Sequence, residues 1–377
     1  MQVPFLDLKA QYKSIKDEVN PAIQKILDNS SYILGEAVFN FEKAFAEAHN
    51  VKHCIGVSSG TDGNHLVLWS LGIKPGDEVI IPANTFIATA WGVTLCGAKP
   101  ILVDCHPDSY NLDPEKVELA ITSKTKAIVA VHLYGQPADM KELKSIADKH
   151  KILLVEDAAQ AHIAEYDGKI VGGLSVASSF SFYPGKNLGA YGEAGAVLTN
   201  DDNLAKTIKM MREHGQSAKY YHDTFGHNYR MEGIQGAVLG VKLNYINKWT
   251  DGRRRAASKY RELLGGLEDI KLPMEMDNVK HVYHLFVIQV KGNNNKKHQE
   301  RRDELQKFLS QKGISTGLHY AIPIHKQKCF EYLGYKAGDF PITEQLAESG
   351  LSLPMFPELT DDQIKYVSDS IKEFFEV

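Results

Sequence analysis

A lysine beside a glycine is the residue of this sequence whose chemistry is easiest to test. Lys186 lies in the segment SFYPGKNLGAYGEAGAV, residues 181–197, after a Tyr-Pro-Gly turn signal and between two strand-like stretches. A lysine partly withdrawn from water has a lowered pKa and becomes nucleophilic, as lysines that form Schiff bases require. The same pattern also suits a lysine on a solvated surface loop, so Lys186 alone identifies no chemistry.

Two further segments contain polar groups that the same edge of a parallel sheet would display. In LLVEDAAQAH, apolar residues precede Glu156 and Asp157, and a carboxylate at the end of a buried strand needs a cation or hydrogen-bond donors. In VSSGTDG, Gly60 and Thr61 lead from a strand into a helix whose free N–H groups favour an anion such as phosphate. Taken singly, a capping aspartate and an ordinary turn explain these two segments as well.

The lysine, the aspartate and the glycine-bearing helix start together form the set of groups that pyridoxal phosphate needs. Lys186 would form the Schiff base with the cofactor. Asp157 would pair with the pyridinium nitrogen and keep it protonated, so that the ring can withdraw electrons. The residues expected to hold the phosphate and to stack on the ring are Ser181, Gly60, Thr61 and Phe86.

The elements that would position these residues alternate between strand and helix patterns from about residue 50 to 200. Strands are predicted at HCIGVSS, DEVIIPA, KPILVDC, KAIVAVHLYG, KILLVEDAAQAH, SVASSFSFYP and AGAVLTND, most of them separated by helical patterns. This order is typical of βαβ units and predicts an α/β fold with a mostly parallel sheet and helices on both faces. Ligands of such a sheet bind outside the carboxyl ends of its strands.

The second part of the chain has a different rhythm. A polar, aromatic loop at 216–231 is followed by two helical segments, 232–249 and 251–267, and later by strand patterns such as ISTGLHY, residues 314–320. We therefore predict a large domain over residues 1–249, including an N-terminal arm, and a smaller α+β domain over residues 250–377.

Composition narrows the class of protein. The 377 residues carry a formal net charge of −4 with both signs interspersed, which argues against a nucleic-acid partner or a polybasic membrane patch. We find no signal peptide and no apolar run of transmembrane length. The four cysteines form no CxxC pair and no cluster with zinc spacing, so we expect no metal and a reduced, cytoplasmic protein.

Several motifs in order along the chain give it a family resemblance. The sequence resembles the DegT/DnrJ/EryC1/StrS family of nucleotide-sugar aminotransferases, which have pyridoxal phosphate fold type I, like aspartate aminotransferase. The segments that carry the resemblance are FLDLKAQY, YILGEAVFNFEKAFA, SSGTDG, GDEVIIPANTFIATA, VEDAAQAHIA, SFYPGKNLGAYGEAGAV, HNYRMEGIQGAVLGVKL and LSLPMFP. Two departures are Ala194, where glycine is more usual, and Ala321, where related chains often have proline.

The resemblance implies a role for individual positions. Lys186 would be the Schiff-base lysine and proton shuttle, Asp157 the partner of the pyridine nitrogen, and Gln160 a neighbour of the ring 3-hydroxyl. Asn228 would reach the phosphate of the other subunit's cofactor, which implies a homodimer with shared active sites. The candidates for contacts with the substrate are Tyr183, Tyr221, Arg230, His319 and His325.

The resemblance also implies a reaction. Within the family, the sequence is most similar to members that transfer the amino group of L-glutamate to a dTDP-3-keto-6-deoxyhexose. Their products are 3-amino-3,6-dideoxy sugars for surface polysaccharides such as O-antigen or for antibiotics. Alternatives are a 4-keto sugar, a UDP-3-keto-uronic acid and, since one branch of the family dehydrates sugars with a histidine in place of the lysine, a dehydratase. Lys186 argues against the last of these. A non-catalytic regulator and a nicotinamide dehydrogenase, whose GxGxxG fingerprint is missing, are further alternatives.

Overall fold

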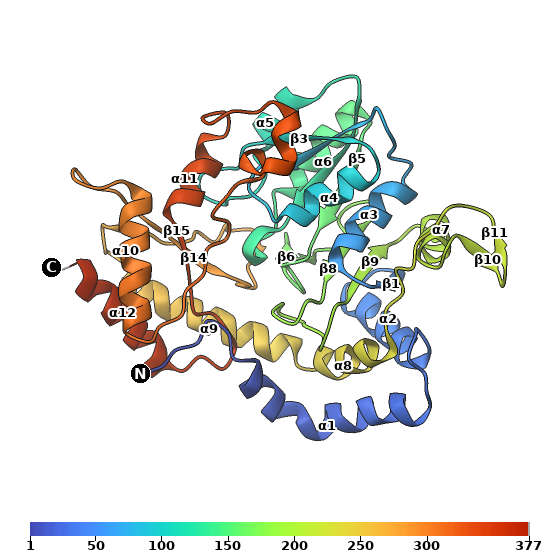
Figure 1. Cartoon of the computed structure of the whole chain (residues 1–377), viewed down its shortest axis with the longest axis horizontal. Coiled ribbons are helices and arrows are strands. Elements are labelled where there is room, and N and C mark those ends of the chain that lie inside the picture. The colour runs from blue at the N-terminus through green and yellow to red at the C-terminus, as the bar shows by residue number, and fades with distance from the viewer. Residues whose placement is uncertain (376–377) are drawn as a thin grey trace.

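A computed structural model describes residues 1–375 (Figure 1). Its centre is a seven-stranded sheet in the order β1–β9–β8–β5–β4–β2–β3. The strands are β1 (His53–Val57), β2 (Glu78–Pro82), β3 (Lys99–Val103), β4 (Thr125–Val131), β5 (Leu153–Asp157), β8 (Ser178–Ser181) and β9 (Gly195–Thr199). Only β9 runs antiparallel to its neighbours in this sheet, which confirms the predicted mostly parallel α/β architecture.

Helices cover both faces of this sheet because successive residues of each strand point to opposite sides. On β2, Val79 and Ile81 face one apolar core, whereas Ile80 faces another. The first face is covered by α3 (Gly60–Ser70), α4 (Ile87–Leu95) and α7 (Asp202–Arg212), and the second by α2 (Glu36–Ala48), α5 (Pro114–Ala120) and α6 (Met140–His150). The Asp113 side chain caps α5, and Pro114 is its first residue.

The C-terminal part builds a second core on a small antiparallel sheet. This sheet has the order β12–β14–β15, with bounds Ile270–Lys271, Phe286–Val290 and Gly350–Leu353. The helices of this part are α9 (Ile246–Leu264), α10 (His298–Gln311), α11 (Pro341–Ser349) and α12 (Asp361–Phe375). The α+β character predicted for this part is therefore present.

The N-terminal arm joins this second core. Val3 is fully buried in it and pairs with Ile314, and the N terminus lies beside α9 and α12 in Figure 1. The predicted strand at 314–320 is wrong, because this segment makes only single bridges, Ile314 with Val3 and Gly317 with Ser352. The arm thus takes the hydrogen bonds that a regular strand would have used.

The helical segments after residue 231 break at a different place than predicted. Helix α8 spans Gly233–Leu243 and α9 begins at Ile246, so the chain turns two residues after α8 and then stays helical through residue 250. Position 252 inside α9 requires glycine, because a Cβ there would lie 2.7 Å from the Pro357 carbonyl oxygen. The division of the chain between residues 249 and 250 therefore falls within a helix, and it stays a prediction.

The remaining elements lie at the edges of the molecule. Helix α1 (Leu8–Asp28) packs on α8, and a hairpin of β10 (Gln216–Ala218) and β11 (Tyr221–His222) projects beyond α7 (Figure 1). A minor sheet holds β6 (Glu165–Tyr166), β7 (Lys169–Ile170) and β13 (Val279–Lys280), and short 3₁₀ helices are η1 (Leu133–Gly135), η2 (Ile324–Lys326) and η3 (Lys328–Leu333). Within residues 1–375, no helix combines the length and apolar character that crossing a membrane requires.

Candidate active site

The start of α3 lies against the end of β8 at the carboxyl edge of the sheet. Ser59 caps α3, and its hydroxyl oxygen accepts a hydrogen bond from the Asp62 N–H at 3.1 Å. A Cβ at Gly60 would lie 2.7 Å from the Ser181 Cβ, so only glycine allows this approach. The structure thus brings Gly60, Thr61 and Ser181 together, with the first N–H groups of a helix available to an anion.

Asp157 closes β5 and is held by neighbouring donors. Its Oδ2 accepts hydrogen bonds from Asn64 Nδ2 at 2.9 Å and from Thr89 Oγ1 at 2.8 Å, and its Oδ1 accepts one from the Ala159 N–H at 3.2 Å. The carboxylate is only 4% exposed, so these donors offset the cost of its burial. They also fix its direction at the sheet edge.

Sequence reasoning missed Asn64 and Thr89 as supports of Asp157. Asn64 follows Gly60 by one turn of α3, and Thr89 lies in the first turn of α4. Asn64 is itself fixed by the Ser179 hydroxyl, and Thr89 by the Thr85 hydroxyl at 2.9 Å. Helical spacing from Gly60 could have pointed to Asn64, whereas the meeting of α4 with β5 is visible only in three dimensions.

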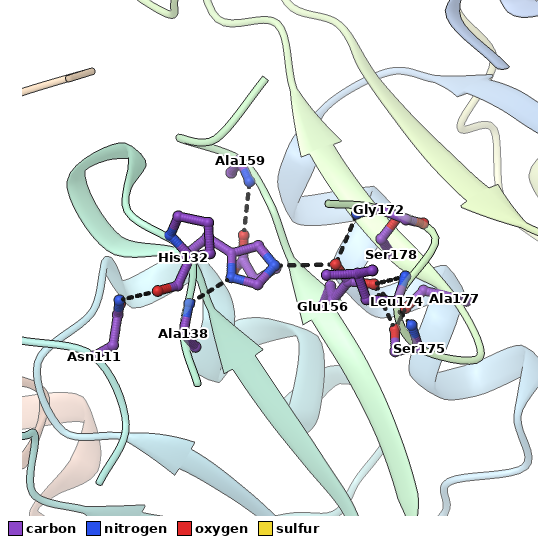
Figure 2. Close-up of polar contacts among 12 residues, drawn as sticks. Asn111, His132, Ala138, Glu156, Ala159, Gly172, Leu174, Ser175, Ala177 and Ser178 are labelled. Atoms are coloured by element: carbon purple, nitrogen blue, oxygen red, sulfur yellow. Dashed lines mark hydrogen bonds and ion pairs between the residues drawn. The ribbon is translucent and has the colours of Figure 1, made fainter. Parts of the chain in front are cut away.

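The adjacent carboxylate, Glu156, serves the opposite side of β5. Figure 2 shows it facing His132, whose Nε2 lies 3.1 Å from Glu156 Oε2. His132 Nδ1 accepts from the Ala138 N–H at 3.0 Å, so Nε2 carries the proton and donates it. Glu156 also accepts from the N–H groups of Gly172 and Ser175. Burial raises its pKa, but these donors outweigh burial and keep the pKa of Glu156 below its usual value. Glu156 therefore anchors loops.

Lys186 lies in the loop that connects β8 to β9. The Ala190 N–H donates to the Phe182 carbonyl at 2.8 Å, and the Lys186 N–H donates to the Tyr183 carbonyl at 2.8 Å. Burial lowers the pKa of the Lys186 amine to about 8, although the Asp157 carboxylate pulls the pKa upward. The uncharged amine is therefore accessible near neutral pH, and it lies within the electrostatic reach of Asp157.

Gln160 and Phe86 meet a tyrosine that the sequence did not single out. Gln160 Oε1 accepts from the Tyr134 N–H at 2.6 Å, and its Nε2 donates to Tyr320 Oη at 2.9 Å. Phe86 is 52% exposed, and its ring centroid lies 5.6 Å from that of Tyr320. Tyr320 thus links Gln160 to Phe86, which leaves a broad apolar surface on Phe86 for a flat ring.

His319 also belongs to this neighbourhood. Burial, together with the Lys186 charge, lowers the pKa of its imidazole to about 4, so the ring is neutral at pH 7. His319 Nδ1 lies 2.8 Å from the Ser352 hydroxyl, and its ring stacks on Phe5 with a centroid distance of 5.8 Å. Phe5 brings the N-terminal arm to the site.

The other candidates lie apart from Lys186 or face outward. The buried His325 is paired with Glu344 at 3.1 Å, so the structure does not bring it to this group. Tyr183 follows Ser181 closely and is 54% exposed. Arg230 pairs with Val57 at the end of β1 and lies partly buried. Tyr221 and Asn228 are exposed on the segment around the β10–β11 hairpin.

These residues fit pyridoxal phosphate. The helix start near Ser181 suits a phosphate, the buried Asp157 suits a protonated pyridine nitrogen, and Phe86 suits the ring face. Lys186, with its lowered pKa, suits a bond to an aldehyde. The chain matches the model of the DegT/DnrJ/EryC1/StrS aminotransferase family over residues 13–372. It belongs to this family.

Individual relatives extend over the whole chain. A Geobacillus stearothermophilus protein named pleiotropic regulatory protein is 45% identical, covering 100% of this chain and 99% of its own. A Streptomyces venezuelae protein named dTDP-3-amino-3,4,6-trideoxy-alpha-D-glucose transaminase is 43% identical, covering 100% of this chain and 97% of its own. The crystal structure of S. venezuelae DesV in complex with a ketimine intermediate superposes with a TM-score of 0.96, at 43% identity, and covers 100% of this chain and 99% of that one.

Family membership settles the class of reaction and the cofactor. The protein is an aminotransferase, and it uses pyridoxal phosphate. The predicted fold, a large α/β part with the aspartate-aminotransferase-like arrangement, is confirmed by the same neighbours.

Proposed function

We propose that the protein transfers the amino group of L-glutamate to a nucleotide-linked keto sugar. The substrate proposed is a dTDP-3-keto-6-deoxyhexose, and the product is the dTDP-3-amino-3,6-dideoxyhexose. One observation carries the proposal: Lys186, with a pKa lowered to about 8, shares the sheet edge with the buried Asp157 and the Gly60 helix start. The name of the Streptomyces venezuelae relative, a transaminase of a dTDP-3-amino sugar, supports the choice of substrate.

Each residue of this chain then has a defined task. Pyridoxal phosphate supplies an aldehyde that accepts and releases the amino group and a ring that withdraws electrons. Lys186 would hold the aldehyde carbon, Asp157 the ring nitrogen, and the Gly60–Thr61 backbone with Ser181 the phosphate. Phe86 would cover one ring face, and Gln160, fixed by Tyr134, would meet the ring hydroxyl.

Lys186 is also the proposed proton carrier. Its Nζ takes the proton from the α-carbon of glutamate in the first half-reaction, which releases 2-oxoglutarate. In the second half-reaction, Lys186 delivers a proton to the sugar carbon that has received nitrogen. A pKa near 8 suits both directions, because the charged and the uncharged amine are both populated near neutral pH. The neutral His319 beside it adds no competing charge, and it could accept a hydrogen bond from a sugar hydroxyl.

The exposed segment near the β10–β11 hairpin supports a homodimer with shared sites. Tyr220 is 80% exposed, Tyr221 71% and Phe225 86%, and Asn228 lies exposed at the end of the same segment. Large apolar side chains gathered in this way are typical of a surface that another chain covers. We propose that a second copy covers them and that Asn228 reaches the phosphate held by that copy's α3.

The experiment offers the purified protein, loaded with pyridoxal phosphate and L-glutamate, three acceptors in parallel. These are a dTDP-3-keto-6-deoxyhexose, dTDP-4-keto-6-deoxyglucose and a UDP-3-keto-uronic acid, and the amino-sugar product is read by mass spectrometry together with 2-oxoglutarate. Amination of only the 3-keto dTDP sugar confirms the proposal. Amination of only one of the other two keeps the transamination and replaces the sugar.

Two further outcomes separate the remaining alternatives. Loss of water from a sugar without formation of 2-oxoglutarate would make the protein a dehydratase. A protein that forms no 2-oxoglutarate with any acceptor would contradict the proposal and would leave a regulatory role, the role that the name of the Geobacillus relative states.

A further inference from the structure

A second buried lysine, Lys242 on α8, contacts the loop that carries Lys186. Lys242 is only 1% exposed, and its Nζ donates to the Gly189 carbonyl oxygen at 2.7 Å. The same ammonium group lies 4.4 Å from the centre of the Tyr191 ring. Burial lowers the pKa of Lys242 to about 8, with the Glu358 carboxylate pulling it back upward. No step of the proposed reaction uses this cation.

One face of α8 holds the end of the Lys186 loop. Gln235 precedes Lys242 by seven positions, which places both on the same side of the helix, about two turns apart. Gln235 Oε1 accepts the hydrogen bond of the Tyr191 N–H at 3.0 Å. The two polar side chains of this face therefore hydrogen-bond to the loop backbone, Lys242 at Gly189 and Gln235 at Tyr191.

These contacts also restrain the backbone near Lys186, because the loop folds back on itself. A Cβ at Gly189 would lie 2.3 Å from the Pro184 carbonyl oxygen, so the backbone at 189 rests directly on the backbone before Lys186. On the other side, Asn187 Nδ2 donates to the Val282 carbonyl at 3.0 Å. The loop backbone around Lys186 is thus held from α8 and from the segment before β14.

Burying a cation to hydrogen-bond one backbone carbonyl is energetically unfavourable unless the charge has a role. Burial of an ammonium group is unfavourable, and the Gly189 carbonyl, the Tyr191 ring and the Glu358 carboxylate together offset only part of that cost. The cation gives a stronger hydrogen bond than a neutral donor.

We propose that Lys242 is a positioning residue for Lys186: its buried ammonium group fixes the loop of residues 182–191 so that the Lys186 amine meets the cofactor's aldehyde. The proposal rests on the function proposed above for Lys186. It assigns Lys242 no contact with substrate or cofactor.

The test compares the full-length protein with K242M, K242R and, as a matched control, R302M. Arg302 is also a buried cation that donates to backbone carbonyls, those of Ala347 and Gly350, but it lies in the C-terminal core. Hydrogen exchange of residues 182–191 is measured without cofactor. The rate at which the cofactor-free protein captures pyridoxal phosphate is then measured by the absorbance of the bound form.

We expect K242M to exchange about tenfold faster at the Lys186 and Ala190 amides and to capture the cofactor about tenfold more slowly. K242R should restore most of both values, because a guanidinium group still donates and remains charged. R302M should lower the melting temperature without changing either value. If K242M does not fold, K242Q, which keeps a donor without a charge, replaces it.

Two results would overturn the inference. One is unchanged exchange and capture in K242M or K242Q, and the other is an equal change in R302M, which would show a general effect of lost stability. Neither result concerns the role of Lys186 itself. Capture by K186A at the normal rate would instead remove the function proposed for Lys186, so the two failures are distinguishable.

Discussion

Lys186 and Lys242 are both withdrawn from water, and burial lowers the pKa of each to about 8. The groups that surround the two amines differ. Lys186 stands at the carboxyl edge of the sheet within reach of Asp157, and its backbone, not its side chain, makes the hydrogen bonds of its loop. The amine of Lys242 donates to the Gly189 carbonyl and is covered by the Tyr191 ring. A lowered pKa alone therefore does not identify the nucleophile, and the groups around the amine must be compared as well.

Replacing Lys186 should have the largest effect, because Lys186 is both the proposed attachment point of the cofactor and the proposed proton carrier. We expect K186A to lower the turnover number by about 10³-fold or more and to remove the visible absorbance of bound cofactor. Steady-state assays and absorbance spectra check this. If K186A kept its turnover while K242M lost it, the comparison between the two lysines would be reversed.

Asp157 sharpens the comparison, because it is the charged partner that Lys186 has at the sheet edge. D157N keeps the shape and removes the charge, and we expect about 10- to 100-fold lower turnover, the value of one hydrogen bond to a charged group. Cofactor affinity should fall less than turnover. An unchanged turnover number would remove Asp157 from the mechanism.

The pH dependence tests whether the Lys186 amine is available as the structure indicates. Its pKa lies below the usual value for lysine, so the reactive uncharged form accumulates from lower pH. Capture of pyridoxal phosphate by the cofactor-free protein should rise about tenfold between pH 6 and 7 and level off above about pH 8. A rate that still rises at pH 10 would show that Lys186 is as basic as a surface lysine.

Mixed dimers test the part of the site that a single chain leaves exposed. K186A and N228A should each be nearly inactive alone, because the first lacks the amine and the second lacks the contact across the dimer. After exchange of subunits in equal amounts, about one quarter of the wild-type activity should return, since half of the dimers are mixed and each has one intact site. Activity that stays at the level of the two variants would place Asn228 within its own subunit's site, or outside it.

The fold and the centre of the site could be predicted because each rests on local patterns. Alternating strands and helices predicted the sheet, and Asp157, Gly60 and Lys186 follow or precede elements that end at one edge. The supports of these residues could not be predicted in the same way. Thr89 reaches Asp157 from α4, and Tyr320 reaches Gln160 from a segment 160 positions away, so only the packed chain shows them.

The wrong prediction of a strand at 314–320 has a similar cause. The segment at 314–320 has the residue pattern of a strand, but the N-terminal arm bridges it at Ile314, and it does not form a regular strand. His325, proposed as a substrate contact, pairs with Glu344 from α11, a partner that its neighbours in the sequence do not indicate, and its role stays a prediction. In both cases the residues contact a segment that is distant in the sequence, and the local sequence pattern does not indicate that contact.

The most direct test of the account locates the cofactor on the chain. The protein loaded with pyridoxal phosphate is reduced with borohydride, digested, and mapped by mass spectrometry, with Lys186 and Lys242, whose pKa values are both lowered to about 8, as internal alternatives. The account predicts that the reduced cofactor is attached to Lys186 and that Lys242 is unmodified. Attachment to Lys242, or to both lysines alike, would contradict it.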